Sequence, residues 1–550
     1  MRIAVIHGYL LSGTGSNIYV ANLASSLANR GHEVFVFCQE PEPHRFGFVN
    51  DCFDFDVDNK RFFRIFSSTG PDGGRVRLFR PRIGQLLPTY VLDDYVGFKT
   101  REFHRLSQEK IAQYVNRTAT AVKTVHSVFD FDVALAQHLI ASPAVARRLS
   151  EEYGVPYHIT IHGSALNYSA KQSTELTPLV IYGLNKAASI VVSSDFLGRQ
   201  LNDYLVDIGH QEIATHVIYP GVEESIFKIG GHPHELIAEL RHSLESRKTL
   251  GKSLGSKEAL RVIVSTENRQ LLAEELNSPP TYERRAPDSD LINVIDNINW
   301  ETEQVVTFAG KYIVGKGLHA LVLAAPNVIC RSPNVRFLAI GFSDVREHFE
   351  ALGAALDAGK GELVIEIVEE LEKGLELQVG REFILDLMQK GTFEKYLQRA
   401  AEADLSKRFI FTGPLDHFEL AKVFAVSDLF VAPSIFPEAF GMVAVEALAT
   451  GIYPIVTEAF GMAEIAKNIR DRVGDFVPQH SKLIPDKNFI PVLSDYILRC
   501  LDSPDLKDMR FKTAAHKIAV ELFNWDRVSV EYLKLFTRFQ QPGRIGGLSI

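Results

Sequence analysis

The chain alternates short apolar segments with helix-like stretches. In the first half, RIAVIHGY (residues 2–9) is followed by a helix-like stretch from about Ser16 to Asn29, and then by EVFVFC (33–38). Gly31 marks the end of that helix. Further apolar runs are DVALAQ, YHITIHG and ASIVVSS. Buried strands that alternate with helices are typical of a parallel sheet with helices on both faces.

The pattern restarts after about residue 303. VVTFAG is followed by a helix through HALVLAAPNV, and then by VRFLAIG, RFIFTG, LFVAP and IYPIV. The sequence therefore predicts an α/β fold of two doubly wound, Rossmann-like domains, at 1–225 and 303–525. We expect them to face a cleft, with the site at the carboxyl ends of the strands.

Two charged, partly helical segments interrupt this pattern, and we interpret them as insertions. The first, 229–300, ends in the exposed-looking SPPTYERRAPDSD, and the second, about 346–406, contains runs such as VIEIVEELEKG. Helical lids or oligomer contacts fit these segments better than independent domains do.

Composition limits the class of protein. The 550 residues are 46% hydrophobic and 23% charged, as in ordinary globular proteins of two or more domains. The net charge of -9 argues against nucleic-acid binding. No apolar run reaches the ~20 residues needed to cross a bilayer, and the start predicts a strand rather than a signal peptide. The four scattered cysteines match no metal or redox spacing, so we expect a cytoplasmic protein.

The stretch VAPSIFPEAFGMVAVEALATG carries two glutamates that suit a nucleotide-sugar donor. Glu438 follows an apolar strand on a loop, and Glu446 lies about one turn inside the next helix. One carboxylate can accept hydrogen bonds from ribose hydroxyls and the other from the donor sugar. The amides of Phe440, Gly441 and Met442, at the helix N-terminus, face the same ligand. The alternative is an ordinary turn with surface glutamates.

A second candidate is the lysine pair in VVTFAGKYIVGKGLHALVLAA. Lys311 and Lys316 lie in a loop between a strand that ends at Gly310 and a helix that begins near Gly317. Two cations there can neutralise a diphosphate leaving group. The order of residues is not that of a Walker loop. Solvated loop lysines are the alternative.

His162 is a third candidate, because it follows the apolar strand YHITI and precedes a glycine. That position predicts a histidine at the carboxyl end of a strand, where it can bind donor-sugar hydroxyls or orient the reacting centre. A purely structural histidine is the alternative.

The loop GYLLSGTGSN is a fourth candidate. Gly13 and Gly15 let the backbone approach a ligand closely. The loop half-resembles a dinucleotide fingerprint, with Glu40 closing the second strand, so an NAD-dependent oxidoreductase is a competing class. Ile18 stands where the third glycine of that fingerprint belongs.

For the acceptor we consider the first domain. The segment 75–98 includes Asp93 and Tyr95, which can accept hydroxyl hydrogen bonds and stack on a sugar ring. The basic, aromatic runs 60–66 and 75–82 are strands or loops with one charged face, or they form a wall that contacts a charged acceptor or an anionic membrane surface. The aspartate triplets fit strands or turns, and we predict no catalytic metal.

Together these motifs resemble family 4 of the retaining glycosyltransferases, which have the GT-B fold. The matching residues are SGTGSN, His162-Gly163, VIYPGVEESIF, Gly310-Lys311 through Lys316-Gly317, Glu438 to Glu446, and the closing FNWDRVSVEYLKLF. Lys311 replaces the usual arginine. The usual Gly-Gly-x-Pro-Glu loop reads FGMAEI, which keeps only Gly461 and Glu464.

The resemblance implies cofactor-free, metal-independent transfer of a sugar from a UDP-, GDP- or ADP-sugar, with retained configuration. The acceptor is a hydroxyl of a small molecule, a saccharide or a lipid-linked compound. The resemblance also implies that a C-terminal helix, about 526–550, completes the first domain. Peripheral membrane contact and homo-oligomerisation stay open.

The resemblance also assigns roles. Lys311 and Lys316 hold the diphosphate, Glu446 binds the ribose, and Glu438 with the 440–442 amides binds the sugar. His162 acts from the other domain. A nucleotide-sugar 2-epimerase on the same fold, or a catalytically silent GT-B partner subunit, is the alternative function.

Overall fold

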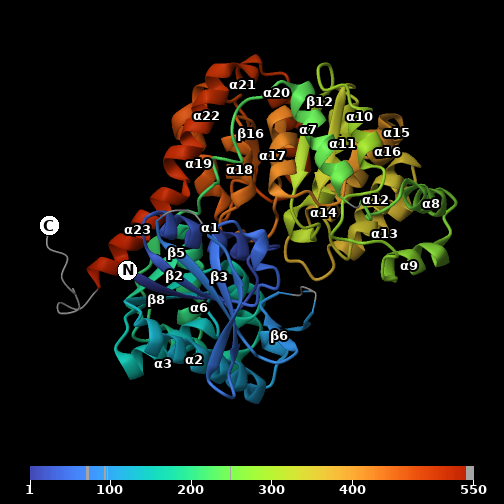
Figure 1. Cartoon of the computed structure of the whole chain (residues 1–550). Helices are drawn as coiled ribbons and strands as arrows, with labels where there is room; N and C mark the ends of the chain where they lie inside the picture. The colour runs from blue at the N-terminus through green and yellow to red at the C-terminus, as the bar shows by residue number, and fades with distance from the viewer. Residues whose placement is uncertain (70–72, 92–94, 96, 248, 540–550) are drawn as a thin grey trace. The chain divides into compact units, whose positions relative to one another are not determined.

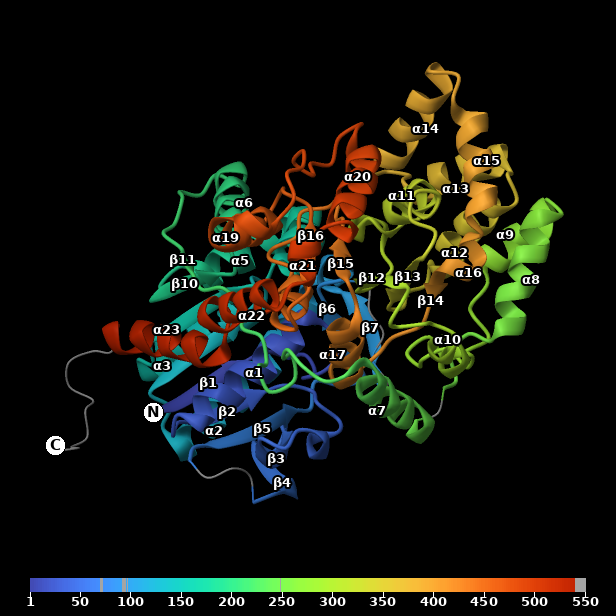
Figure 2. The same ribbon diagram turned by 90° about the horizontal axis from the view of Figure 1, so that it is seen from above.

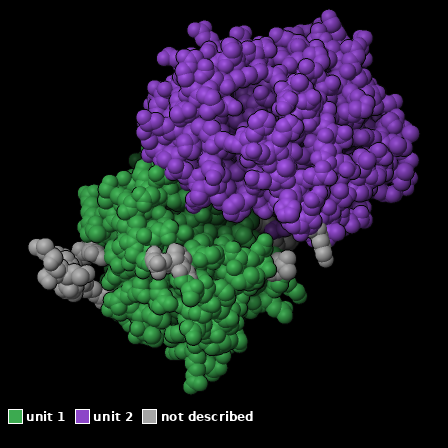
Figure 3. All heavy atoms as spheres, turned by 45° about the horizontal axis from the view of Figure 1, so that its top comes forward, with its two compact units in different colours: residues 1–221, 522–550 green, residues 222–521 purple. Residues whose placement is uncertain are grey.

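The computed structural model describes residues 1–69, 73–91, 95, 97–247 and 249–539. The chain divides into two compact units, coloured separately in Figure 3. Unit 1 is Met1–Gly221 with Leu522–Ile550, and unit 2 is Val222–Glu521. Each unit has its own sheet with helices packed against it, as Figure 1 shows. The α/β fold class is therefore confirmed.

Unit 1 is built on a nine-stranded sheet in the order β11-β10-β9-β8-β1-β2-β5-β3-β4. All neighbours are parallel except β4, which runs antiparallel to β3 at one edge. The strands are β1 (Arg2–Ile6), β2 (Glu33–Phe37), β3 (Val49–Asp56), β4 (Arg61–Ser67), β5 (Arg75–Pro81), β8 (Val133–Gln137), β9 (Tyr157–Ile161), β10 (Ser189–Val192) and β11 (His216–Val217). Every apolar run that we predicted as a strand in this half is one of them. The strand order reverses between β1 and β8.

Helix α23 (Trp525–Arg538) packs on α1 (Gly15–Asn29) within unit 1. The hydroxyls of Tyr19 and Tyr532 lie 2.8 Å apart, and the Tyr532 hydroxyl is 2.6 Å from the side-chain hydroxyl of Thr160 in β9. The other elements are α2 (Gln108–Phe129), α3 (Ser142–Tyr153), α4 (Gly163–Tyr168), α5 (Thr177–Leu184), α6 (Asp195–Asp207) and the small parallel pair β6 (Leu86–Thr89) and β7 (Lys99–Glu102).

Unit 2 has a five-stranded, fully parallel sheet in the order β14-β13-β12-β15-β16. Its strands are β12 (Gln304–Ala309), β13 (Val335–Ile340), β14 (Phe409–Phe411), β15 (Leu429–Ala432) and β16 (Tyr453–Val456), all of them predicted from the sequence. The chain runs from β12 outward to β13 and β14, and then returns to β15 on the other side of β12. The strand order therefore reverses between β12 and β15, where open α/β sheets bind ligands.

Both inserted segments lie in unit 2 and contribute helices to it. The helices are α7 (Pro233–Ser246), α8 (Leu254–Ser265), α9 (Arg269–Asn277), α10 (Leu291–Asp296), α11 (Leu318–Ile329), α12 (Arg346–Asp357), α13 (Gly361–Leu371), α14 (Val379–Gln389), α15 (Phe393–Ala403), α16 (Leu405–Arg408), α17 (His417–Val426), α18 (Met442–Ala449), α19 (Met462–Val473), α20 (Phe489–Leu501), α21 (Pro504–Lys507) and α22 (Met509–Leu522). Figure 2 shows α7 beside α17 and α8 beside α12, so the first segment packs on the rest of the unit. None of the described helices is long and apolar enough to cross a membrane.

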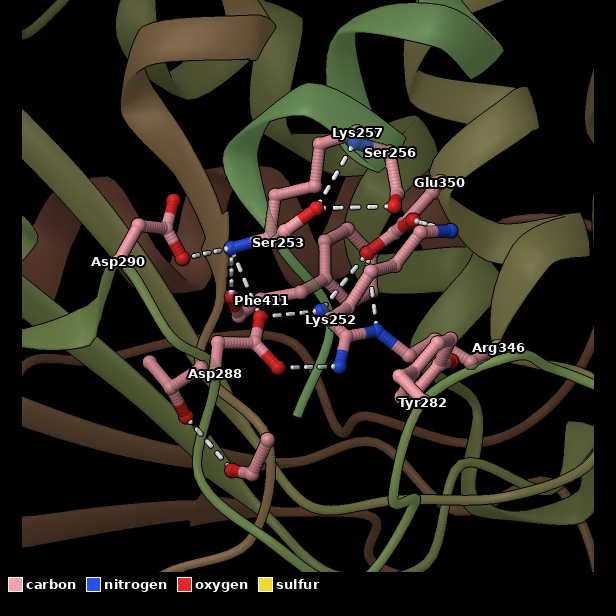
Figure 4. Close-up of polar contacts among 12 residues, drawn as sticks. Lys252, Ser253, Ser256, Lys257, Tyr282, Asp288, Asp290, Arg346, Glu350 and Phe411 are labelled. Carbon is pink, nitrogen blue, oxygen red and sulfur yellow. Dashed lines mark hydrogen bonds and ion pairs between the residues drawn. The ribbon is translucent and has the colours of Figure 1, made fainter. Parts of the chain in front are cut away.

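A network of buried charges joins the first inserted segment to α12, as Figure 4 shows. Asp288 is completely buried and accepts two hydrogen bonds from Arg346, at 2.7 and 2.6 Å. Lys252 is 1% exposed and lies 2.7 Å from Glu350. Burial opposes ionisation of Glu350, but the charges of Arg346 and Lys252 outweigh it and lower its pKa to about 2. The expectation that SPPTYERRAPDSD is exposed was therefore wrong for Asp288, whose charge is paired rather than solvated.

Candidate functional site

The two loops that carry the candidate donor residues meet where the strand order of unit 2 reverses. The amides of Ile435 and Phe436, after β15, both donate to the carbonyl of Gly315, after β12, at 2.9 and 3.1 Å. Gly317 has φ +74, and a Cβ there would clash with the carbonyl of Pro433. Only glycine fits both the left-handed conformation and this approach, so the loops are held tightly together.

Lys316 and Glu438 form an ion pair across these loops. The Lys316 side chain is 31% exposed and that of Glu438 is 20% exposed. Ser434 also donates to Glu438, at 3.3 Å. The structure therefore brings together a lysine and a glutamate that lie far apart in the sequence, and the pair is open enough to exchange its partners for a ligand.

Glu446, in α18, is buried beneath the start of that helix and is only 5% exposed. One carboxylate oxygen lies 3.9 Å from Nε2 of His417. The other, Oε2, is buried and makes no hydrogen bond to any described residue. Burial raises the pKa of this carboxyl, and His417 only partly opposes the shift. A buried carboxylate oxygen without a donor is costly unless a ligand satisfies it.

Helix α18 begins at Met442, with Gly441 in a left-handed conformation at φ +104 as its N-cap. The preceding residue, Phe440, is 4% exposed. The three residues predicted to offer amides therefore lie at a helix N-terminus. The N-terminus of a helix favours anions and hydrogen-bond acceptors.

The string EAFGM occurs twice in the sequence, at 438–442 and at 458–462, and the two copies contact one another in the fold. The Gly461 amide donates to the carbonyl of Glu438 at 2.9 Å, and a Cβ at Gly461 would clash with the carbonyl of Ala439. In return, a Cβ at Gly441 would approach the side chain of Met462 to 2.8 Å. Each glycine makes room for the other copy of the string, and no local pattern predicts that the two copies are adjacent.

Lys311 directly follows Gly310, whose φ is +151, and is half-buried. Its carbonyl accepts from the amide of Ile313 at 2.9 Å, and the hydroxyl of the next residue, Tyr312, donates to the carbonyl of Ala339 at 2.6 Å. The lysine is thus carried on a loop that is anchored to β13, at the same end of the sheet as Lys316.

In unit 1, His162 lies at the carboxyl end of β9 and is the N-cap of α4. Its Nε2 is 2.9 Å from Oε1 of Gln137, and its ring lies 4.6 Å from that of His138, which in turn stacks on the ring of His7 at 5.6 Å. Burial lowers the pKa of His162 to about 3 and that of His7 to about 4, and it lowers the pKa of His138 well below its usual value. These histidines are therefore neutral near pH 7. A neutral imidazole can both donate a hydrogen bond to a hydroxyl and accept one from it.

Sequence reasoning missed His7 and His138. Each follows a strand, as His162 does, and His138 has φ +69. Neither ring nitrogen of His138 has a hydrogen-bond partner among the described residues, although the side chain is completely buried. The signal that could have found them is their shared position after β1 and β8.

The glycine loop of unit 1 lies after β1. Gly13 has φ +100, and Gly15 is the first residue of α1, where an added Cβ would meet nothing within 4 Å. The Glu40 carboxylate, which a dinucleotide site would use for ribose, instead accepts from the amides of Leu11 and Glu42 at 2.9 and 3.0 Å. The loop geometry therefore does not favour the oxidoreductase interpretation.

The predicted acceptor residues are placed only in part. Tyr95 is 5% exposed and packs with Leu10 and Leu87 in a small apolar cluster. Asp93 lies outside the described residues. The basic runs 60–66 and 75–82 form β4 and β5, as strands with charged faces.

Comparisons with known proteins agree with this geometry. Residues 14–214 match the model described as glycosyl transferase 4-like domain, and residues 293–515 match glycosyl transferases group 1. D-inositol 3-phosphate glycosyltransferase of Mycobacterium tuberculosis is 32% identical over 140 residues, which are 25% of this chain and 27% of that protein. The match therefore spans about a quarter of that relative's length.

Solved structures resemble the whole fold. Sucrose-phosphate synthase from Thermosynechococcus elongatus has a TM-score of 0.51 at 18% identity, over 98% of both chains. The Anabaena protein HepE in complex with UDP has a TM-score of 0.52 at 14% identity, over 98% of this chain and 100% of that chain. Trehalose-6-phosphate synthase OtsA has a TM-score of 0.53 at 10% identity, over 98% of this chain and 99% of that chain.

Two Rossmann-like units, with lysines and glutamates where the strand order of unit 2 reverses, define a protein of the GT-B class. The two family models match successive parts of the chain and narrow the class further. The chain belongs to the family-4 type of glycosyltransferases.

Proposed function

We propose that this chain is a retaining, metal-independent glycosyltransferase that moves a sugar from a nucleoside diphosphate sugar to an acceptor hydroxyl. The observation that carries the proposal is Glu446, whose buried Oε2 has no hydrogen-bond donor among the described residues. A ribose supplies two hydroxyl donors, which suit a carboxylate held in one position.

Before the substrate binds, Lys316 and Glu438 pair with each other, and the substrate replaces that ion pair with its own contacts to both side chains. A diphosphate competes for the lysine, because it carries more charge than one carboxylate. Glu438 is then free to accept hydrogen bonds from the sugar hydroxyls, together with the amides of 440–442. Lys311 is the second cation for the diphosphate, so that charge neutralisation does not require a metal.

In the transfer, the bond between the anomeric carbon and the diphosphate oxygen breaks, and a bond from that carbon to the acceptor oxygen forms. The acceptor proton passes to the leaving diphosphate, and the products are the glycoside and the nucleoside diphosphate. Lys311 and Lys316 stabilise the negative charge that grows on the leaving group. We assign His162 to bind substrate hydroxyls as a neutral imidazole.

The first assay measures release of nucleoside diphosphate from UDP-, GDP- and ADP-sugars, with and without an acceptor panel. UDP-glucose is the first donor to test, since HepE has been solved in complex with UDP-glucose. Polyols and their phosphates are the first acceptors, since the curated relative is named for an inositol phosphate. Nuclear magnetic resonance of the product determines whether the anomeric configuration is retained.

The same assay separates the alternatives. A 2-epimerase converts the donor without any acceptor, and a silent subunit binds the donor without releasing nucleoside diphosphate. Full activity in EDTA is expected, whereas loss in EDTA with recovery in Mg²⁺ or Mn²⁺ would refute metal independence. Glu394, exposed on α15, provides a matched Glu→Gln control for variants of the site.

A further inference from the structure

A cavity of about 550 Å³ lies in unit 2 beside β14, the edge strand of the sheet. Its walls come from β14 and from α8, α10, α12 and α16, so both inserted segments contribute. Strands β13 and β12 separate β14 from β15, and the cavity therefore does not overlap the donor residues. Its volume is within the range of small-molecule sites.

The charges that line this cavity are mostly basic. Five lysine or arginine side chains face three acidic ones. The acidic group of Glu350 is already paired with Lys252 and Arg346, and that of Asp290 with Lys257 at 2.8 Å (Figure 4). The third carboxylate, Asp404, is paired with Lys407 at 2.7 Å. All three carboxylates are therefore already paired.

Two guanidinium groups of the wall form no salt bridge with a carboxylate of the described residues, although the charge of Arg408 helps to lower the pKa of Asp404. Arg261 donates to the carbonyl of Ser406 at 2.9 Å. Arg408 has one terminal nitrogen, Nη1, that is buried and makes no hydrogen bond to any described residue. By contrast, Arg336, on the same wall, is paired with Glu303 at 2.8 Å. A buried guanidinium donor without an acceptor is energetically costly, and an anion that reached it would remove that cost.

We propose that this cavity binds a small phosphorylated metabolite, with its phosphate on Arg261 and Arg408. Guanidinium groups recognise phosphate oxygens with paired hydrogen bonds. The cavity is larger than a phosphate ion, and apolar side chains such as Leu260 and Val322 also line it, so the ligand has an uncharged body as well. Because both inserted segments supply walls, the ligand would fix them to each other.

The test is calorimetric titration of the full chain with three probes: D-glucose 6-phosphate, inorganic phosphate and D-glucose. Glucose 6-phosphate should bind and glucose should not. Arg261→Gln and Arg408→Gln should each weaken binding by about tenfold or more, because each removes a charged hydrogen bond to phosphate. Arg399→Gln, at an exposed site on α15, is the matched control and should bind as the wild type does.

Gly353 provides a variant that blocks the cavity without touching a charge. It lines the cavity from α12, and a Cβ at this position would meet nothing within 4 Å. Gly353→Phe should therefore fold, as its melting temperature can verify, and should abolish binding. The donor residue Lys316 is replaced by alanine in a parallel titration, so that binding of phosphate at the donor site is recognised.

The outcomes distinguish a phosphorylated metabolite from inorganic phosphate as the ligand, and they distinguish the cavity from the donor site as the place of binding. Equal affinity for inorganic phosphate, with the same dependence on Arg408, would support the phosphate site and identify the free ion as a ligand. Binding that survives both arginine substitutions, or that is lost in Lys316→Ala, would overturn the proposal, as would the absence of heat with either phosphate. The proposed sugar transfer can fail its own assay without changing any of these results.

Discussion

Glu446→Gln should stabilise the unliganded protein and weaken donor binding at the same time. The carboxylate is 5% exposed, and one oxygen has no donor among the described residues. Leaving a buried polar group unsatisfied costs roughly 1–3 kcal/mol, and more when the group is charged. Glutamine keeps a buried polar group at this position but carries no charge, so the substitution should raise the free energy of unfolding by about 1–2 kcal/mol at pH 7.5.

The stability difference between Glu446→Gln and the wild type should depend on pH. Burial raises the folded-state pKa of Glu446, so the folded state holds its proton more tightly than the unfolded state does. The contribution of Glu446 to stability is therefore fully present below the unfolded pKa of about 4.5, and it is lost as pH rises through the folded pKa. The advantage of Glu446→Gln should be present at pH 7.5 and should disappear near pH 4.5.

Two measurements test this prediction. Thermal unfolding of wild type, Glu446→Gln and Glu394→Gln at both pH values gives the stability differences. Titration with UDP-glucose should show a loss of affinity of about tenfold or more, because the amide accepts at only one of its two ends. A variant that is less stable than wild type at pH 7.5, with unchanged donor affinity, would refute the assignment of Glu446 to a ribose.

The remaining predictions concern the loops and the histidines. Lys316→Ala should lower kcat by about 10²–10³. Loss of its half-buried ion pair with Glu438 should change the melting temperature little, and a near-normal kcat would refute the role. Gly317→Ala should cost more stability than Gly359→Ala in urea unfolding, because both have positive φ but only Gly317 meets backbone; equal losses would exclude the close approach. The lowered pKa of His7 contributes stability that is present above pH 6.5 and lost as pH falls toward 4. That loss is roughly 3 kcal/mol at most, and His7→Gln should flatten the pH profile of unfolding.

Both sheets could be predicted because their strands are local features. β8 and β9 are buried at every residue, and such strands read as continuous apolar runs that differ sharply from their polar surroundings. The order of strands could not be read in this way. The place of β15 beside β12 depends on packing between segments that are distant in the sequence, and it is this order that makes the loops after β12 and β15 neighbours.

The sequence predicted where the candidate site residues lie along the chain, but it did not predict which side chains contact them. Glu438 and Glu446 lie on the loop and the helix that the sequence predicted. The partners that define their chemistry come from elsewhere: Lys316 for one and His417 for the other. No local pattern encodes such pairs, and the buried Asp288 shows the same limitation, since its polarity predicted exposure and its partner Arg346 lies in the other inserted segment.

The molecule buries charge in two different ways, and the difference supports the two ligand sites that we propose. Around Asp288 each buried charge has an opposite partner within hydrogen-bond distance, so the network is complete and serves the fold. At Glu446 and Arg408 a buried polar atom lacks a partner among the described residues, although the surrounding chain offers many groups that could have provided one. Folding alone gives no reason to keep such atoms, because replacing them with apolar groups would be neutral or stabilising. Binding does give a reason, since a carboxylate can serve hydroxyl donors and a guanidinium can serve a phosphate.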